Sequence, residues 1–131
     1  MKLEQIPSLR IVPDYLLSVK GGMSLQSIKD NFDVFDNDPG NIFFGIYDED
    51  KIIGTIWFQV DDITKELFII IFSLDKKYHS CDGYNIKALA EVARAIKRDM
   101  GLNKILWATT RPRAFEKLGF KRSKNVLMEA E

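Results

Sequence analysis

The fold is decided by residues 67–109, which read LFIIIFSL DKKYHSCDGY NIKALAEVARAIKRDM GLN KILWAT. The segment 67–74 is almost continuously apolar, as expected for a central strand that is covered on both faces. Residues 75–84 are polar and predict a loop. Residues 85–100 carry apolar side chains at helical spacing, and the glycine that follows favours a helix end. The apolar segment 104–110 predicts another strand, so the whole stretch predicts a parallel strand–helix–strand crossover.

Two more strands are predicted upstream of this crossover. Residues 41–48 (NIFFGIYD) and 51–60 (KIIGTIWFQV) are rich in β-branched and aromatic residues, and the short acidic turn between them favours a hairpin. A second turn, 61–65, leads into 67–74. These segments predict an antiparallel meander ahead of the parallel step. The sequence therefore indicates an α/β fold with a mixed sheet and helices on both faces.

The two ends of the chain are less regular than its middle. The segments predicted there are a strand over 3–6, helices that begin at Pro13 and span 25–32 and 112–118, and a last strand over 120–128. The element order is therefore small helices, a meander, a long helix, a strand, a short helix and a strand.

Length and composition limit the class of protein. The chain has 131 residues, of which 46% are apolar, and this fits a single domain over 1–131. One cysteine cannot form a disulfide within the chain. No apolar run approaches the ~18 residues of a membrane span, and the first residues carry no apolar signal segment. We therefore expect a protein of the reducing cytoplasm with no membrane partner.

The net charge of zero conceals an uneven distribution of charge. Residues 1–75 carry 6 basic and 13 acidic side chains, whereas residues 76–131 carry 13 basic and 6 acidic ones. Opposed halves of this kind suggest an anionic ligand on one side and a cationic ligand on the other. Ordinary solvated surface explains the same charges, because many of the acids stand in turns. The sequence leaves both interpretations open.

Several other kinds of site are disfavoured by the sequence. His79 and Cys81 supply only two metal ligands, so a structural zinc site is excluded by count and no metal is expected. No phosphate-loop, dinucleotide, serine-hydrolase or metalloprotease motif occurs. Trp57 and Trp107 stand inside apolar strands, and the basic C-terminal half contains no nucleic-acid-binding motif. A nucleic-acid partner is therefore not expected.

The element order and two local stretches resemble the GNAT superfamily of acyl-CoA-dependent N-acyltransferases. One stretch is Glu116–Phe120 (EKLGF), a segment that commonly closes the last helix of that family. The other is the loop and helix over 77–101, which ends in a glycine ahead of the strand KILW. The resemblance covers roughly residues 41–122. It implies a single GNAT-like domain with acetyl-CoA as its co-substrate.

The resemblance also places the acetyl-CoA site. In the family, an Arg/Gln-x-x-Gly-x-Gly/Ala loop ahead of the long helix holds the CoA pyrophosphate on backbone N–H groups. The matching stretch is 79–85 (HSCDGYN), where Gly83 is the only glycine and the Asp beside it opposes a phosphate. An ordinary loop before a helix explains the same residues. The residues that the resemblance assigns to acetyl-CoA are Leu74, Lys76, Lys77, Cys81, Gly83, Tyr84, Asn85, Ile86 and Arg113.

The catalytic groups of the family are matched less well. Its general acid is a Tyr just before EKLGF, and the corresponding residue here is Phe115, which has no proton to donate. Tyr84 or Tyr78 are possible substitutes, although each is also explained as a packing residue. Glu66 is the candidate base that takes a proton from the amine, with Asp61 and Asp62 in the preceding turn as further candidates. Solvation of a turn and a strand edge explains these acids equally.

The resemblance implies an N-acyltransferase that passes an acyl group from acetyl-CoA directly to an amine on a small molecule or a protein. The alternative is a non-catalytic GNAT-like binding or structural protein, of the diverged kind found in phages and other mobile elements. The single glycine at 83 and Phe115 favour the alternative, whereas the central strand and long helix are neutral between the two. We expect a monomer or a homodimer.

Overall fold

The structure is a computed structural model that describes residues 2–19, 23–108, 121–122 and 127–130, with the backbone alone described for 80–85, 108, 121–122 and 127–130. The chain divides into two compact units. The first comprises Met1–Gln59 and Ile70–Lys77, and the second comprises Val60–Ile69 and Tyr78–Glu131.

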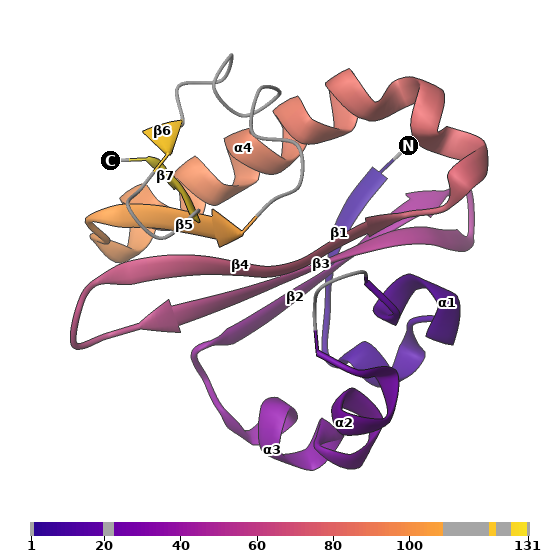
Figure 1. Ribbon diagram of the computed structural model, residues 1–131, viewed down its shortest axis with the longest axis horizontal. Coiled ribbons are helices and arrows are strands. Elements are labelled where there is room, and N and C mark those ends of the chain that lie inside the picture. The colour runs from indigo at the N-terminus through magenta and orange to yellow at the C-terminus, as the bar shows by residue number, and fades with distance from the viewer. Residues whose placement is uncertain (1, 20–22, 109–120, 123–126, 131) are drawn as a thin grey trace. The chain divides into compact units, whose positions relative to one another are not determined.

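The elements appear along the chain in Figure 1. The strands are β1 (Lys2–Ile6), β2 (Asn41–Asp48), β3 (Lys51–Asp61), β4 (Glu66–Leu74), β5 (Lys104–Ala108), β6 (Lys121–Arg122) and β7 (Leu127–Ala130). The helices are α1 (Asp14–Leu17), α2 (Leu25–Asp30), α3 (Phe32–Asn37) and α4 (Asp82–Met100), with short 3-10 helices η1 (Leu9–Ile11) and η2 (Lys76–Cys81). The strand order is β1-β2-β3-β4-β5-β7-β6. The predicted α/β class with a mixed sheet is confirmed, and β4 lies inside the sheet.

The first unit is built on antiparallel strands. β2 pairs with β1 on one side and with β3 on the other, so that Phe43 stands opposite both Ile6 and Trp57. An irregularity in the β2–β3 register falls between Ile46 and Tyr47. β4 then follows β3 through a four-residue connection and is its neighbour in the sheet. A connection this short reverses the chain, which confirms the predicted meander.

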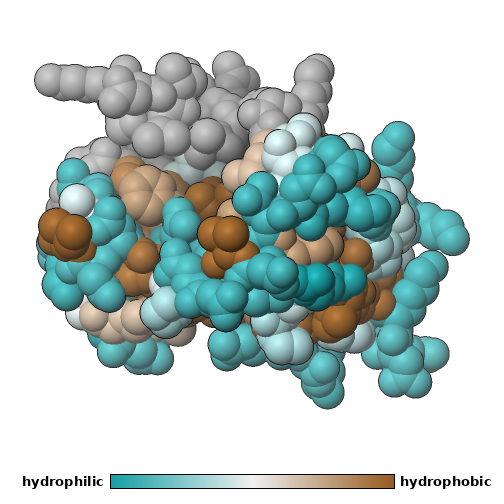
Figure 2. Space-filling model, turned by 90° about the horizontal axis from the view of Figure 1, so that it is seen from below, coloured by the Kyte–Doolittle hydropathy of each residue, from teal (hydrophilic) through white to brown (hydrophobic). Residues whose placement is uncertain are grey.

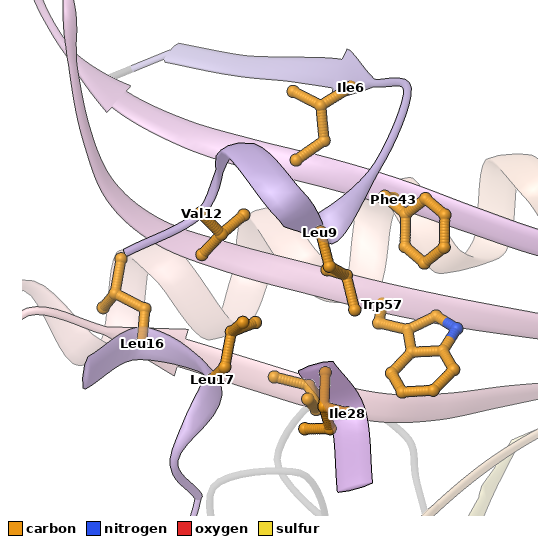
Figure 3. Close-up of a cluster of buried hydrophobic side chains, with 9 residues drawn as sticks. Ile6, Leu9, Val12, Leu16, Leu17, Ile28, Phe43 and Trp57 are labelled. Carbon is orange, nitrogen blue, oxygen red and sulfur yellow. The ribbon is translucent and has the colours of Figure 1, made fainter. Parts of the chain in front are cut away.

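The core of the first unit lies between these strands and the small helices, which cover one face of them (Figure 1). Figure 3 shows side chains from β1, η1, α1 and α2 directed toward β2 and β3. The buried cluster comprises Ile6, Leu9, Val12, Leu16, Leu17, Ile28, Phe43, Trp57 and Ile71. Trp57 is held there by its indole N–H, which donates to Asn41 Oδ1 at 2.9 Å, and by the Phe35 ring, whose centroid lies 4.6 Å away. These apolar contacts hold the small helices on the sheet, since helices of four to six residues are not stable alone.

Local capping sets where these helices begin and end. The Ser8 hydroxyl accepts from Arg10 N at the start of η1, and the Ser24 hydroxyl accepts from Ser27 N at the start of α2. Asn31 then separates α2 from α3 with φ −116° and ψ 16°. The sequence predicts a single helix over 25–32, and its predicted C-terminal end is wrong. The first helix ends before Asn31, and a second helix begins after it.

The second unit contains the parallel step. β4 and β5 pair in parallel from Glu66 opposite Lys104 to Ile69 opposite Trp107, which confirms the predicted crossover. The helix end predicted at Gly101 is also confirmed. Gly101 has φ +66°, and the N–H of Leu102 donates to the carbonyl of Lys97 at 2.9 Å, a pattern that terminates helices.

Other predictions for this part of the chain need correction. The helix expected over 112–118 lies outside the described residues, as does the end of the strand expected over 104–110. The single last strand expected over 120–128 is wrong. β6 and β7 are two strands that pair antiparallel with each other, with Lys121 opposite Glu129, so the chain reverses between them. On β4, the buried residues Leu67, Ile69 and Ile71 alternate with partly exposed ones, so full burial of both faces is not observed.

Candidate active site: the end of strand β4 and the start of helix α4

The last residues of β4 extend beyond its pairing with β5. The register ends at Ile69 opposite Trp107, whereas β4 continues to Leu74. Within the described part of β5, no residue is in register with 70–74. Strand edges can bind extended ligands through backbone N–H and C=O groups. This edge leads directly into the segment that the sequence assigns to acetyl-CoA.

The end of β4 is fixed on β3 by two close contacts. The N–H of Asp75 donates to the carbonyl of Ile53 at 2.7 Å. Beside it, a Cβ built on Gly54 would lie 2.6 Å from the carbonyl oxygen of Ser73 and 3.1 Å from Leu74 Cδ1. Only a glycine lets the two strands approach this closely, since real Cβ atoms do not approach a backbone atom to less than 3.0 Å. Gly54 therefore sets the position of the last residues of β4.

The Asp75 carboxylate joins this strand end to two other elements. Its Oδ1 accepts from the backbone N–H of Lys77 at 3.1 Å, which caps the start of η2, and its Oδ2 accepts from the hydroxyl of Tyr15 in α1 at 2.9 Å. The Lys77 N–H and then the Tyr15 hydroxyl lower the pKa of Asp75, and Lys51 and Lys77 add a favourable charge interaction. Burial, followed by the hydrogen bond to Asp75, raises the pKa of Tyr15. The pair is therefore a carboxylate with a neutral phenol.

The polar loop predicted over 75–84 is wrong. Residues Lys76–Cys81 form η2, and α4 begins immediately after it at Asp82. Gly83 is consequently a residue of the first turn of α4 and is not part of a loop. The sequence does not predict this helix, because its residues are polar and have no apolar period. The helix starts where the Asp75 carboxylate supplies a cap.

All of the residues assigned to acetyl-CoA except Arg113 lie on one continuous segment, 74–86. Lys76 and Lys77 are exposed, Leu74 is half-buried at the end of β4, and the Ile86 side chain is buried. Ile86 is thus a packing residue of α4 that can offer only backbone groups. Cys81, Gly83, Tyr84 and Asn85 are described by their helical or 3-10 backbone. Arg113, together with Phe115, lies outside the described residues.

The candidate catalytic residues lie apart from one another along the chain. Glu66 is half-buried at the first position of β4, in register with Lys104 and three residues before the pairing with β5 ends. At ~3.3 Å per residue, it stands about 10 Å along the strand from Ile69. Asp61 is used in the β3–β4 turn, where Oδ1 accepts from the N–H groups of Ile63 and Thr64. Tyr84 follows the other end of β4, in α4. The structure places Glu66 and Tyr84 at opposite ends of this region.

Sequence reasoning missed Tyr15 and Asp75, which lie 60 residues apart in the chain. One local signal was present for Asp75. An Asp directly after an apolar strand and just before a helical segment is a preferred cap. No local pattern identifies its phenol partner.

The described residues contain neither a metal-binding cluster nor a membrane-spanning helix. In the ranges that the structure covers, no three His, Cys, Asp or Glu side chains gather in a way that could bind a metal ion. No helix described here has the length and apolarity needed to cross a membrane.

Comparisons with known proteins agree with this topology. Residues 14–120 match the model of the acetyltransferase (GNAT) family. Among solved structures, the chain is similar to a chimera of the Vibrio cholerae spermidine N-acetyltransferase SpeG and hSSAT, with a TM-score of 0.71, 14% identity, and coverage of 98% of this chain and 95% of the other. It is also similar to the aminoglycoside 6′-N-acetyltransferase from Enterococcus faecium, with a TM-score of 0.69, 13% identity, and coverage of 99% and 96%.

A third similar structure is a Bacillus subtilis acetyltransferase in complex with CoA, with a TM-score of 0.65, 11% identity, and coverage of 98% and 95%. No curated protein sequence shows a significant match. Identities this low establish a common fold and leave substrates open. The family match spans most of the chain, from α1 to the end of the motif EKLGF, and the chain therefore belongs to the GNAT acetyltransferase family.

Proposed function

We propose that the chain is an N-acyltransferase that uses acetyl-CoA as its acyl donor and transfers the acyl group directly to an amine. The observation that carries this proposal is the end of β4, where residues 70–74 continue past the last pair with β5 and lead into the segment 74–86. Membership of the GNAT family supports acetyl-CoA as the donor.

The described residues suit such a donor in two respects. Residues 70–74 of β4 lie beyond the register with β5, and an extended strand presents alternating N–H and C=O groups of the kind that pair with the amide groups of a pantetheine arm. The exposed ammonium groups of Lys76 and Lys77 follow directly and supply positive charge for phosphate groups. Because η2 leads straight into α4, the phosphate contacts would come from this helical segment. Leu74, Cys81, Gly83, Tyr84, Asn85, Ile86 and Arg113 remain proposed donor contacts.

The transfer requires few protein groups. The amine nitrogen attacks the thioester carbonyl carbon, the C–N bond forms, and the C–S bond breaks with its electron pair on sulfur. The nitrogen must lose a proton and the sulfur must gain one. We propose Glu66, acting through intervening water molecules because it lies at the far end of β4, as the acceptor of the first proton, and Tyr84 as the donor of the second. With Phe115 in place of the family tyrosine, water is the alternative donor.

The acceptor is proposed to be an amine, either on a small molecule or on a protein. Two similar structures are named for spermidine and aminoglycoside acetylation, and both of these substrates carry amines. The excess of acidic over basic residues in 1–75 favours a cationic molecule. We further propose that the two units act as one domain, as a monomer or a homodimer, in a reducing cytoplasm. A single cooperative unfolding transition would support the single domain, and two separate transitions would contradict it.

Thermal melts with acetyl-CoA, CoA and ATP test the donor. Binding to the folded state at a hundredfold excess over Kd stabilises by ~2.7 kcal/mol, which is several degrees for this chain length. We expect a shift with both CoA compounds that exceeds the shift with ATP and is lost in Gly83→Glu. An equal shift with ATP would indicate a general basic surface. No shift with any CoA compound would contradict the enzyme and leave the non-catalytic alternative.

Release of free CoA thiol in the presence of a panel of amines tests the reaction. Glu66→Gln is expected to lower kcat by ~100-fold or more if Glu66 takes the proton, with little change in the Kd of acetyl-CoA. The matched control is Asp50→Asn, an exposed acid in the turn between β2 and β3. Equal activity of Glu66→Gln and the wild type would exclude Glu66 as the base. CoA binding without turnover on any amine would favour the non-catalytic alternative.

A further inference from the structure

Asp75 is the residue at which three elements of the first unit meet. Its N–H is bound to the carbonyl of Ile53 in β3, its Oδ1 to the N–H of Lys77 in η2, and its Oδ2 to the hydroxyl of Tyr15 in α1. These bonds measure 2.7, 3.1 and 2.9 Å. One residue therefore fixes the end of β4, the start of η2 and the exposed side of α1.

The two carboxylate oxygens have separate tasks. A rotation of the side chain that improved one bond would lengthen the other, so Tyr15 holds the carboxylate in the orientation that caps η2. The hydroxyl reaches Asp75 from a helix 60 residues earlier in the chain, and that helix is anchored in the core by the buried side chains of Leu16 and Leu17. The orientation of Asp75 is thus set by a packed element and does not depend on a ligand.

We propose that Asp75 is a positioning residue for the acyl donor, held in place by Tyr15, and that it fixes the course of the chain from β4 into η2. The proposal rests on the proposed function, because it concerns the segment that would bind acetyl-CoA. Asp75 touches no phosphate in this role. It orders the backbone N–H groups and the Lys76 and Lys77 side chains that would.

The charge of Asp75 allows the proposal to be tested by the direction in which the Kd of CoA changes when the carboxylate is removed. A carboxylate beside an anion-binding segment repels phosphate, so a carboxylate without a positioning role would weaken donor binding. Its removal would then strengthen the binding of CoA. If Asp75 orders the segment, its truncation weakens the binding of CoA although a negative charge is lost. The two accounts predict changes of Kd in opposite directions.

The experiment compares Asp75→Ala, Asp75→Asn and Tyr15→Phe, with the Kd of CoA measured by titration calorimetry. Asn keeps an oxygen for the Lys77 N–H and removes the charge, since Asn is as good a cap as Asp. Its NH2 group takes the place of Oδ2 and can donate to the Tyr15 hydroxyl oxygen instead of accepting from it. We expect Asp75→Ala to raise Kd by about fivefold, the effect of losing one helix cap, and Asp75→Asn to bind at least as tightly as the wild type. Tyr15→Phe is expected to raise Kd by ~2-fold, with kcat at saturating donor unchanged.

Asp38→Ala is the matched control. Asp38 is an exposed acid of the same unit whose Oδ1 accepts from the backbone N–H of Gly40 at 2.8 Å, so its loss removes the same charge and the same kind of bond. Its Kd for CoA is expected to equal that of the wild type. If Asp75→Ala bound CoA as tightly as Asp75→Asn, or if Asp38→Ala weakened binding equally, the positioning role would be excluded.

Amide hydrogen exchange without ligand separates this inference from the proposed function. Asp75→Ala is expected to speed exchange at Lys77 by fivefold or more, whereas Asp75→Asn leaves it near the wild-type rate. A wild-type protein that does not bind CoA would refute the proposed function, and the exchange pattern would still test the positioning. Equal exchange in Asp75→Ala and the wild type would overturn the inference even if CoA binds.

Discussion

Gly54→Ala is the substitution that most directly tests how the end of β4 is positioned. The added Cβ would lie 2.6 Å from the Ser73 carbonyl oxygen and 2.9 Å from Ile46 Cδ1. Ordinary carbon–oxygen contacts in sheets begin at ~3.3 Å, so the backbone at Ser73 must move by roughly 0.7 Å. Overpacking of this kind costs about 1–3 kcal/mol, of which ~0.5 kcal/mol is offset because Ala replaces a glycine in a strand. For a chain of this length, the expected fall in Tm is about 2–10 °C.

Two other glycines provide matched controls for this measurement. At Gly45 the added Cβ meets the half-buried Tyr47 ring at 2.8 Å, and a ring edge can rotate away. Gly101 has φ +66° and open space, so Gly101→Ala costs about 1 kcal/mol through backbone strain alone. Calorimetric melts of all three variants, followed by CoA titration, are the assay. We expect Gly54→Ala alone to weaken CoA binding at a temperature where all three are folded. A Gly54→Ala variant with the Tm of Gly45→Ala, or with unchanged CoA affinity, would refute the reasoning.

Three further perturbations probe the first unit. Trp57→Phe should lower the free energy of unfolding, measured in urea, by about 1–3 kcal/mol. It removes the indole hydrogen bond to Asn41 and part of a side chain that is 1% exposed. A loss below ~0.5 kcal/mol would contradict this account of the Trp57 contacts. The lowered pKa of Asp75 adds stability above pH ~4 that is lost as the pH falls through the folded value. The stability difference between the wild type and Asp75→Asn should therefore shrink from pH 6 to pH 3, and a constant difference would argue against the Asp75 bonds. Arg10→Lys should lower the free energy of unfolding by less than ~1 kcal/mol, and by less still in 1 M salt, since the half-exposed guanidinium pairs with Asp36 at 3.1 Å. Arg10 also lies over the Phe32 ring, 5.1 Å from its centroid, and an effect independent of salt would indicate that this packing dominates.

The middle of the fold was predictable because its signals are local and periodic. β2 ends at Asp48 as predicted, and α4 ends at Met100, where the positive φ of Gly101 matches the glycine rule for helix ends. The parallel step from β4 to β5 followed from the strand–helix–strand spacing. In each case neighbouring residues decide the conformation.

The start of the candidate site was not predictable in the same way. Residues 76–84 have no apolar period, so sequence reading favours a loop, whereas the structure has η2 and the first turn of α4. The helical conformation begins where the Asp75 carboxylate accepts from Lys77 N, and that carboxylate is oriented by Tyr15. A contact across 60 residues leaves no local pattern. The break at Asn31 is a smaller case, since helix-compatible residues stand on both sides of it.

The acidic residue next to the donor segment also changes meaning once its contacts are known. From sequence alone, an Asp beside a phosphate site is an electrostatic cost, as expected for Asp82, because only the count of charges is visible. In the structure, the Asp75 carboxylate is bonded to a backbone N–H and a phenol, and Lys51 and Lys77 interact with its charge. Asp75, Lys76 and Lys77 together keep a net positive charge at the end of β4. In the proposed role, the Asp75 carboxylate orders the cations that would bind a phosphate, although its own charge opposes one. Asp75→Asn separates the repulsion of phosphate by the carboxylate charge from the ordering of the segment by the cap, because it removes the charge and keeps the cap.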